Sequence, residues 1–217
     1  MKPQITVPFA VPFGVSRMPD PERLNATLRS LFLERESLGA EYANPYPTMQ
    51  TVNALFESRF DLFLWPEPCV RELREFCWNQ LYQFIGDVNG IDGNMLSRLH
   101  GHADAWFHIT RNRGYFALHN HPMASWSGVY CVDAGSEQSG GLLSFPDPNS
   151  SAAMFKDAAN RNLPLPYGQI TREFRLEPGQ LILFPSWLMH QVTPFEGQGA
   201  RVTVAFNTWF TLDSRTA

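Results

Sequence analysis

The sequence has few cysteines. Only three of its 217 residues are cysteines, an odd number without the regular spacing of a disulfide-rich domain. Cys69 and Cys77 lie in a helical pattern, which separates them by roughly 12 Å at about 1.5 Å per residue, beyond the reach of a disulfide. We therefore expect a reducing, cytoplasmic setting.

Two further absences exclude classes of function. A formal net charge of −4, without any run of basic residues, argues against a nucleic-acid-binding protein. No apolar stretch approaches the roughly 20 residues that a membrane-spanning helix needs. Pro3, Pro8 and Pro12 interrupt the apolar N-terminus, which therefore predicts an edge strand and not a signal peptide. We expect neither nucleic-acid nor membrane partners.

Hydrophobic periodicity predicts helices first and strands afterwards. Helices are predicted over about 20–37, around 52–56 and over about 67–85. From about 105 the period changes to two, and candidate strands follow at 105–110, 116–121, 127–133, 142–145, 169–176, 180–184 and 201–210. Residues 147–168 are predicted to be a long connection. No repeat or linker divides the chain, so we expect a single domain over 1–217, with a helical part at about 20–90 packed on a β-part at about 105–210.

Three histidines are the candidate ligands of a metal ion. His119 and His121 are predicted to project from the same face of a strand, because side chains alternate with period two. His190 follows a turn, an apolar strand and a second turn, and Arg201 opens another strand eleven residues later. Imidazole binds several first-row metals, so the ligand type alone does not choose the ion. The pattern predicts a mononuclear metal site at the mouth of a β-barrel.

These motifs together resemble those of the iron(II)- and 2-oxoglutarate-dependent oxygenases, in their prolyl-hydroxylase-like branch. The shared motifs are the His-x-His strand, a tyrosine-containing strand, a Gly-Gly turn leading to Phe-Pro, a Pro-x-Gly turn, the distal histidine and the later arginine, here at residues 119–121, 127–130, 140–146, 178–180, 190 and 201. The resemblance implies a mainly β fold, a double-stranded β-helix (a jelly roll or cupin-like barrel) flanked by two or three N-terminal helices. It also implies a 2-oxoglutarate-dependent dioxygenase, a hydroxylase of a small molecule or amino-acid-like substrate.

The resemblance also implies roles for single residues. His119 and His190 would be ligands of Fe(II), and Arg201 would form a paired salt bridge with the far carboxylate of the cosubstrate 2-oxoglutarate. Thr203 and Asn207 share the inward face with Arg201 by alternation and are further candidates for the cosubstrate pocket.

In the oxygenases that this chain resembles, one strand often contributes a hydroxyl to the cosubstrate. The corresponding strand here carries Ser127 and Tyr130. These two candidates are three residues apart, so they cannot both point inward on a regular strand. Alternate positions counted from His121 predict that the side chains of Ser127, Val129 and Cys131 face the inside of the barrel.

His121 departs from the family, which has an aspartate or glutamate at this position. We expect His121 to be a third ligand. Two alternatives remain open: His121 lies near the metal while a water or a distant carboxylate such as Asp147 coordinates, or the site is degraded. His102 and His108 fall outside the spacing and are predicted to be surface or packed histidines.

Two other classes of function are also consistent with the sequence. Gly179, Pro185 and His190 resemble the second motif of cupins, whose three-histidine members are metal dioxygenases that do not use 2-oxoglutarate. Residues 122–128 lack the glutamate of the first cupin motif, and Arg201 has no role in that alternative. The other class is a non-catalytic metal-binding barrel. The sequence leaves the oligomeric state open, a homodimer being one option.

Overall fold

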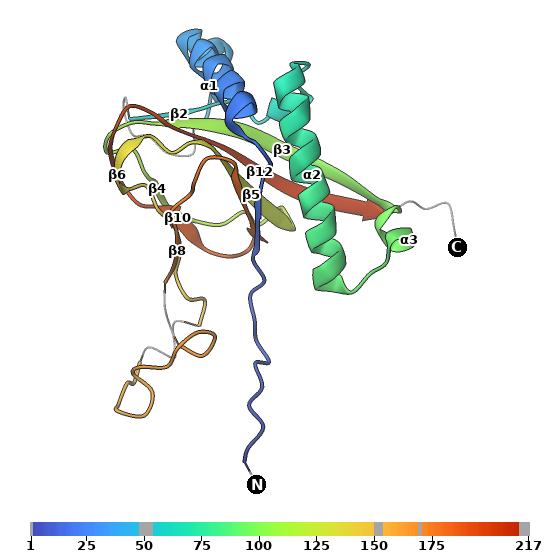
Figure 1. The fold of residues 1–217 in the computed structure, drawn as a ribbon, viewed down its shortest axis with the longest axis vertical. Helices are drawn as coiled ribbons and strands as arrows, with labels where there is room; N and C mark the ends of the chain where they lie inside the picture. Colours follow the sequence, from blue (N-terminus) through green and yellow to red (C-terminus); the bar gives the residue numbers. More distant parts are fainter. Residues whose placement is uncertain (1, 48–53, 150–153, 169–170, 213–217) are drawn as a thin grey trace.

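Two long helices lie along a large twisted sheet in the computed structural model of the chain (Figure 1). The structure describes residues 2–47, 54–149, 154–168 and 171–212. The helices are α1 (Glu22–Ser37) and α2 (Pro68–Asn89), followed by the short α3 (Gly93–Leu96). Two single turns of 3-10 helix, η1 (Gly39–Glu41) and η2 (Leu62–Leu64), lie in the connections.

The strands form two main antiparallel sheets. The larger has the order β1-β9-β5-β12-β3-β2, with bounds Gly14–Arg17, Gln180–Pro185, Trp126–Asp133, Arg201–Leu212, Leu99–Thr110 and Leu55–Glu57. The smaller has the order β4-β10-β7-β8, with bounds Phe116–His119, His190–Val192, Leu143–Phe145 and Arg172–Phe174. β6 (Ser136–Gly140) pairs with β11 (Phe195–Gln198). This mainly β arrangement, with the helices first, confirms the predicted jelly-roll fold class.

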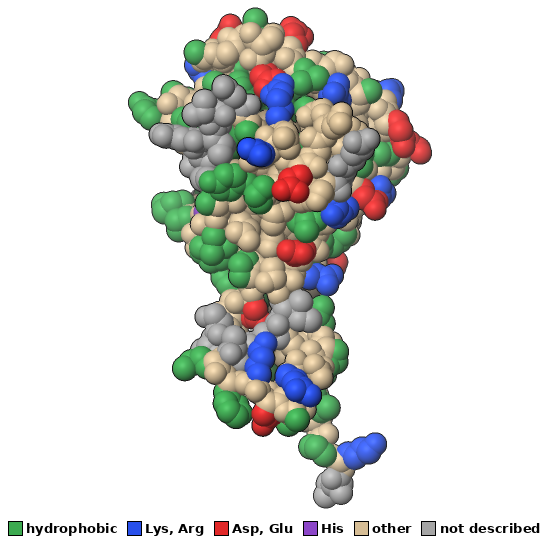
Figure 2. Space-filling model, turned by 90° about the vertical axis from the view of Figure 1, so that its left-hand side faces the viewer, with side chains coloured by type: hydrophobic (Ala, Val, Ile, Leu, Met, Phe, Trp, Pro, Cys, Tyr) green, Lys and Arg blue, Asp and Glu red, His purple; other side chains and the backbone are tan. Residues whose placement is uncertain are grey.

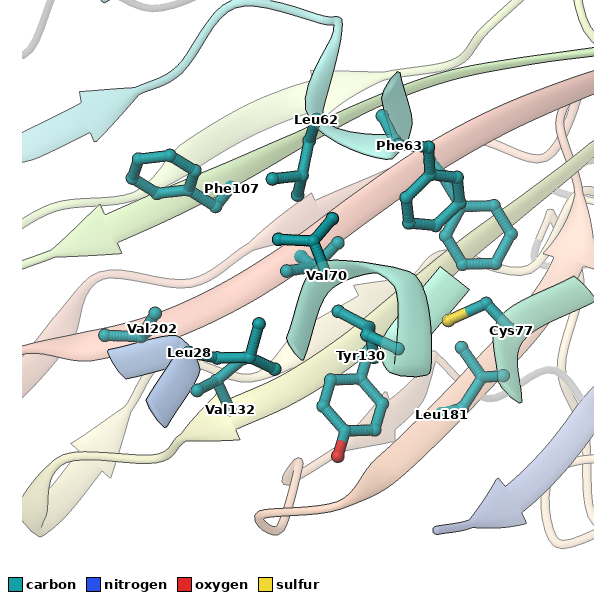
Figure 3. Close-up of a cluster of buried hydrophobic side chains, with 14 of the residues drawn as sticks. Leu28, Leu62, Phe63, Val70, Cys77, Phe107, Tyr130, Val132, Leu181 and Val202 are labelled. Carbon is teal, nitrogen blue, oxygen red and sulfur yellow. The ribbon is translucent and has the colours of Figure 1, made fainter. Parts of the chain in front are cut away.

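Successive side chains along each strand point to opposite faces of the large sheet. On β5, Tyr130 and Val132 pack with α1 and α2 residues in the main core, where Leu28 and Val70 are fully buried (Figure 3). Cys131, between them, belongs to a second cluster that lies between the sheets. Each large apolar side chain buried in this way contributes about 1.5–3 kcal/mol. The helices therefore cover one face of the large sheet and leave its other face for the site.

Most predicted elements are present, with shifted ends. The two long helices are confirmed, and α2 continues to Asn89, where Gly90 in the left-handed region ends it. The strand predicted at 105–110 is β3, which begins earlier, at Leu99. Within the predicted strand 169–176, residues 169 and 170 lie outside the described residues, and the strand covers Arg172–Phe174.

Two predicted elements are wrong. The apolar N-terminus forms no strand over residues 2–13; the strand begins at Gly14, past the prolines, which lack the N–H group that a sheet needs. The helix predicted around 52–56 is also wrong where it is described: residues 48–53 lie outside the described residues, but Leu55 to Glu57 form β2, which pairs with β3. Partner strands distant in sequence decide the structure there.

The long connection stands away from the sheets. Its described residues 154–168 contain no helix or strand and lie almost entirely exposed, in the narrower part below the body of the molecule (Figures 1 and 2). Over the described ranges, we find no helix that is long and apolar enough to cross a membrane.

Candidate active site

Three histidine rings converge where β4 meets β10. His119 and His190 are direct cross-strand partners, and their ring centroids lie 4.3 Å apart. β4 ends at His119, so His121 lies just beyond the strand that was predicted to hold it. Its backbone N–H donates to Ser186 O at 2.9 Å, and its ring lies 5.0 Å from His119 and 5.1 Å from His190. One nitrogen from each ring lies within 4.8 Å of the other two.

Backbone carbonyls orient two of the three rings. His119 Nδ1 lies 2.7 Å from Ala117 O, and His190 Nδ1 lies 2.9 Å from Leu188 O. A carbonyl oxygen only accepts, so each Nδ1 carries the hydrogen and donates it. The lone pair of each neutral ring is then on Nε2, which is the tautomer a metal ligand needs.

Burial keeps two of the rings neutral. Burial, together with the nearby His119, lowers the pKa of His190 to about 3. The His190 ring packs against Phe184 and Phe145, with centroids 4.8 and 5.7 Å away. Burial likewise lowers the pKa of His121 to about 4. Both rings are therefore unprotonated near pH 7, as ligation requires.

The histidines line a small cavity of about 60 Å³ between the sheets. Most of the side chains predicted for the site line this same cavity. They are His119, His121, His190, Ser127, Arg201, Thr203 and Asn207. The structure thus brings together residues that are up to 88 positions apart in the chain, from Asn207 back to His119.

Arg201 is the buried cation of the cavity. Its side chain is 4% exposed, and burial lowers its pKa. Its Nη2 has no hydrogen-bond partner among the described residues, and no ion pair is found for it there. Burying a charged donor without a partner is costly. A carboxylate-bearing ligand would supply the missing acceptor, so these residues fit 2-oxoglutarate.

The Gly-Gly turn packs between this arginine and the start of β11. Gly140 and Gly141 have φ angles of +67° and +62°, which side chains rarely adopt. A Cβ on Gly140 would lie 1.8 Å from Pro194 O, and one on Gly141 would lie 3.1 Å from Phe195 Cδ2 and 3.4 Å from Arg201 Cδ. A side chain at Gly140 would therefore collide with the backbone that leads into β11.

Ser127 and Asn207 are held by each other. Ser127 Oγ donates to Asn207 Oδ1 at 2.7 Å, and Ser186 Oγ lies 2.8 Å from Ser127 Oγ. Because the Ser127 hydrogen is used on Asn207, Ser186 donates to Ser127. This chain of hydrogen bonds links β12, β5 and the end of β9 beside the histidines.

Tyr130 is not part of the cavity, which corrects its prediction as a cosubstrate residue. It faces the helices, and its hydroxyl donates to Asn25 Oδ1 at 2.8 Å. The parity argument for this strand is confirmed, because Ser127 and Val129 line the cavity and Cys131 lies between the sheets. Burial raises the pKa of the Cys131 thiol to about 12, so it stays protonated.

The carboxylate near the site is not the one considered from the sequence. Asp147 does not line the cavity, and its Oδ1 accepts from Asn149 N at 2.8 Å. Among the described residues, Glu57 of β2 is the only acid that lines the cavity. It is absent from the predicted site because the pattern at 52–56 predicts a helix. His102 lies at the surface beside Trp209, as predicted.

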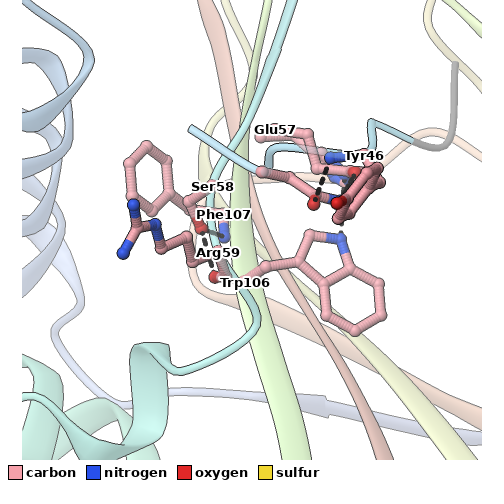
Figure 4. A network of polar contacts seen from close by, with 8 residues as sticks. Tyr46, Glu57, Ser58, Arg59, Trp106 and Phe107 are labelled. Carbon is pink, nitrogen blue, oxygen red and sulfur yellow. Dashed lines mark hydrogen bonds and ion pairs between the residues drawn. The ribbon is translucent and has the colours of Figure 1, made fainter. Parts of the chain in front are cut away.

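Glu57 belongs to a buried polar group at the β2 edge (Figure 4). It is the cross-strand partner of His108, which is packed, as predicted, but also lines the cavity. Asn44 Nδ2 donates to Glu57 Oε1 at 2.6 Å, and Trp106 Nε1 donates to His108 Nε2 at 2.9 Å. Glu57 Oε2 lies 3.3 Å from that nitrogen. Burial lowers the pKa of His108 despite the opposing effect of Glu57, so the ring is neutral near pH 7.

Comparison with known proteins identifies relatives of this fold. Residues 104–207 match the family described as "Putative 2OG-Fe(II) oxygenase". A Pseudomonas putida prolyl-4-hydroxylase superposes with a TM-score of 0.55 at 15% identity, over 93% of this chain and 94% of that one. A Trichoplax adhaerens prolyl hydroxylase in complex with a hypoxia inducible factor peptide fragment superposes with a TM-score of 0.57 at 12% identity, over 91% and 83%.

A third structure has a different activity. The non-heme alpha ketoglutarate dependent epimerase SnoN from nogalamycin biosynthesis superposes with a TM-score of 0.56 at 9% identity, over 90% of this chain and 77% of that one. No curated protein matches this chain by sequence. At these identities the structural likenesses establish the fold.

The position of Tyr130 predicts a structural role. In Tyr130→Phe, Asn25 Oδ1 loses its buried donor, so we expect a loss of about 1–3 kcal/mol in the free energy of unfolding. The affinity for 2-oxoglutarate should not change, because the hydroxyl lies on the helix side of the sheet. Urea denaturation and a 2-oxoglutarate titration test both parts. Weaker cosubstrate binding at unchanged stability would restore Tyr130 to the site.

The pKa of His190 predicts that the metal-free protein loses stability in acid. The folded pKa is about 3, against about 6.5 in the unfolded chain. The unfolded chain therefore binds a proton first as the pH falls, and stability present above about 6.5 is lost toward pH 3. At pH 5, His190 alone should cost roughly 2 kcal/mol relative to pH 7.5.

The comparison that checks this is urea unfolding of the metal-free protein between pH 5 and 7.5. His190→Gln should have a shallower dependence of stability on pH than the parent, whereas the surface substitution His102→Gln should not. The same slope in His190→Gln and in the parent would contradict the assigned pKa shift.

Proposed function

We propose that this chain, whose residues 104–207 match the 2OG-Fe(II) oxygenase family, is an iron(II)- and 2-oxoglutarate-dependent hydroxylase of a small molecule or amino-acid-like substrate. The observation that carries the proposal is the shared cavity. A buried arginine with an unpartnered Nη2 and three converging imidazoles line the same 60 Å³. The arginine fits the cosubstrate, and the imidazoles fit the metal.

The three histidines would hold Fe(II). His119 and His190 present Nε2, because their Nδ1 atoms donate to backbone carbonyls. His121 joins them from the segment that Ser186 holds. When bound, Fe(II) and 2-oxoglutarate supply the oxidising chemistry that activates O2 for attack on the substrate. The protein contributes the positions of the donor atoms and an apolar wall that includes Phe116 and Phe184.

Arg201 would bind the far carboxylate of 2-oxoglutarate. A guanidinium can donate two parallel hydrogen bonds to a carboxylate, which fixes both the position and the direction of the ligand. Thr203 lies two residues along the same inward face and offers a hydroxyl. The cosubstrate would then extend from β12 toward the histidines, with Ser127 and Asn207 along the cavity wall.

The prolyl hydroxylases among the similar structures support an amino-acid-like substrate, and the epimerase supports a small molecule.

The three-histidine set is also consistent with a cupin-type enzyme. A cupin-type dioxygenase that does not use 2-oxoglutarate would also bind its metal through three neutral imidazoles. That alternative leaves the buried Arg201 without an anionic ligand, and the cost of burying its charge favours the 2-oxoglutarate enzyme.

Arg201→Ala separates the two alternatives. Loss of a charge-assisted bidentate contact costs about 1.5–3 kcal/mol, so we expect the apparent Michaelis constant for 2-oxoglutarate to rise roughly 10- to 100-fold. The measurement is conversion of 2-oxoglutarate to succinate with Fe(II) and O2. Arg161→Ala, an exposed arginine in the long connection, is the matched control and should behave like the parent.

His190→Ala is the companion variant for the metal. It should lose bound iron and 2-oxoglutarate turnover together, while Arg201→Ala keeps the iron. Turnover that needs Fe(II) but is indifferent to Arg201 would favour the cupin-type enzyme. A parent protein that binds no iron would contradict the proposal.

A further inference from the structure

The cavity side of the large sheet continues past the histidines along β3 and β12. Directly opposite residues of this antiparallel pair share a face, and every second residue of each strand lies on it. Trp106 and Asn207 line the cavity. Asp104 lies opposite Asn207, and one step further out His102 lies opposite Trp209. Asp104 and Trp209 therefore extend the inner surface of the cavity.

The outer part of this face is uncovered, whereas the opposite face is packed. Asp104 and Trp209 are exposed. On the opposite face, Ala103 and Phe210 pack against the main core, and the Trp78 ring of α2 lies 6.1 Å from the Phe210 ring. In Figure 1 the ends of β3 and β12 reach past the smaller sheet, beside α2. A ligand lying on the uncovered face would extend from these strand ends to the histidines.

Asp104 brings a carboxylate to this face just beyond the histidine cluster. The Trp106 ring lies 6.1 Å from the His121 ring. Asp104 is two residues from Trp106, or roughly 7 Å along a strand. A carboxylate exposed to water is ionised near neutral pH. No hydrogen bond or ion pair is found for the Asp104 side chain within the described ranges, so the charge is available to a ligand.

Indole rings flank this carboxylate. Trp106 is its neighbour along the strand, and Trp209 is its diagonal neighbour across the strand pair, within reach of a long side chain. The Trp209 ring stacks on His102, with centroids 5.8 Å apart and planes 14° apart. A carboxylate beside aromatic rings favours a cation, because the charge and the ring quadrupoles both attract it.

Opposite charges occupy the two ends of the face. Asp104 is paired with Asn207, which follows Arg201 by six residues, roughly 20 Å along β12. Trp106, next to His121, is paired with Ala205 and lies between the two charges. Arg201 at the inner end attracts the anionic cosubstrate, and Asp104 at the outer end attracts a cation.

We infer that Asp104 and Trp209 select a substrate that carries a cationic nitrogen, as an ammonium or guanidinium group. This inference rests on the proposed function and narrows its small-molecule or amino-acid-like substrate to amines and guanidines. The cationic group lies on the outer face, and the carbon that is hydroxylated lies toward the histidines. An anionic substrate is disfavoured because Asp104 repels it.

Binding to the metal-free protein tests the charge preference without turnover. The probes are butylammonium and the uncharged 1-butanol, titrated while the indole N–H signals are followed by NMR. The parent should bind butylammonium more tightly. Asp104→Asn should weaken butylammonium binding about two- to fivefold, as expected for an exposed charge pair, and should leave 1-butanol binding unchanged. Asp104→Glu should keep the preference, and Trp209→Leu should weaken butylammonium binding by a similar factor.

Two further variants are controls for position and for the chain's own C-terminus. Asp87 is an exposed aspartate of α2, on the other side of the sheet, so Asp87→Asn should behave like the parent. The chain ends in residues that include Arg215. Tighter binding of butylammonium in Arg215→Gln than in the parent would assign the face to the chain's own C-terminus and overturn the inference.

Turnover tests the class of substrate. Amino acids and amines that stimulate conversion of 2-oxoglutarate to succinate should lose this effect when their cationic nitrogen is acetylated. Acetylating the α-amino group or the side-chain amino group of a basic amino acid shows which of the two is recognised. Asp104→Asn should raise the Michaelis constant of the stimulating compound about two- to fivefold.

Equal affinities for butylammonium and 1-butanol in the parent would overturn the inference, whatever the turnover. Unchanged butylammonium affinity in a folded Asp104→Asn would overturn it as well, and so would equal stimulation by acetylated compounds. A parent protein that prefers butylammonium but binds neither Fe(II) nor 2-oxoglutarate would instead contradict the proposed function.

Discussion

The antiparallel pairing of β4 with β10 is the constraint on which the site depends. It sets His119 opposite His190 and brings the two rings within 4.3 Å, although 71 positions separate them in the chain. His121 follows because its N–H donates to Ser186, in the turn that leads into β10. A one-residue slip in this pairing would turn one histidine away from the other. The register is thus a condition for a common metal site.

The same two-residue period separates the core face of the large sheet from its cavity face. On β12, Arg201 and Thr203 line the cavity, while Val202 and Val204 pack under the helices. The helices cover the apolar face and stabilise the sheet, so the inner face can carry polar and charged groups that contribute little packing energy. The buried arginine illustrates the consequence: the fold stabilises a group whose partner is a ligand.

Strand periodicity was sufficient to predict much of this arrangement from the sequence. It placed Arg201, Thr203 and Asn207 on one face, and it selected Ser127 over Tyr130 for the cavity. It could not predict Glu57, because a three-residue strand has too few positions to establish a period, and its place depends on pairing with β3. It also placed the N-terminal strand too early, since the prolines exclude sheet pairing where the apolar residues suggest it. Local pattern predicts the face of a long strand, whereas short edge strands are decided by their distant partners.

The central claim is that this chain binds iron through three neutral imidazoles and no carboxylate ligand. X-ray absorption at the iron edge of the anaerobic Fe(II)-loaded protein counts imidazole donors directly, through the multiple scattering of their rings. We expect three imidazoles in the parent protein and two in His121→Ala. Two imidazoles in the parent, with the same number in His121→Ala, would contradict it.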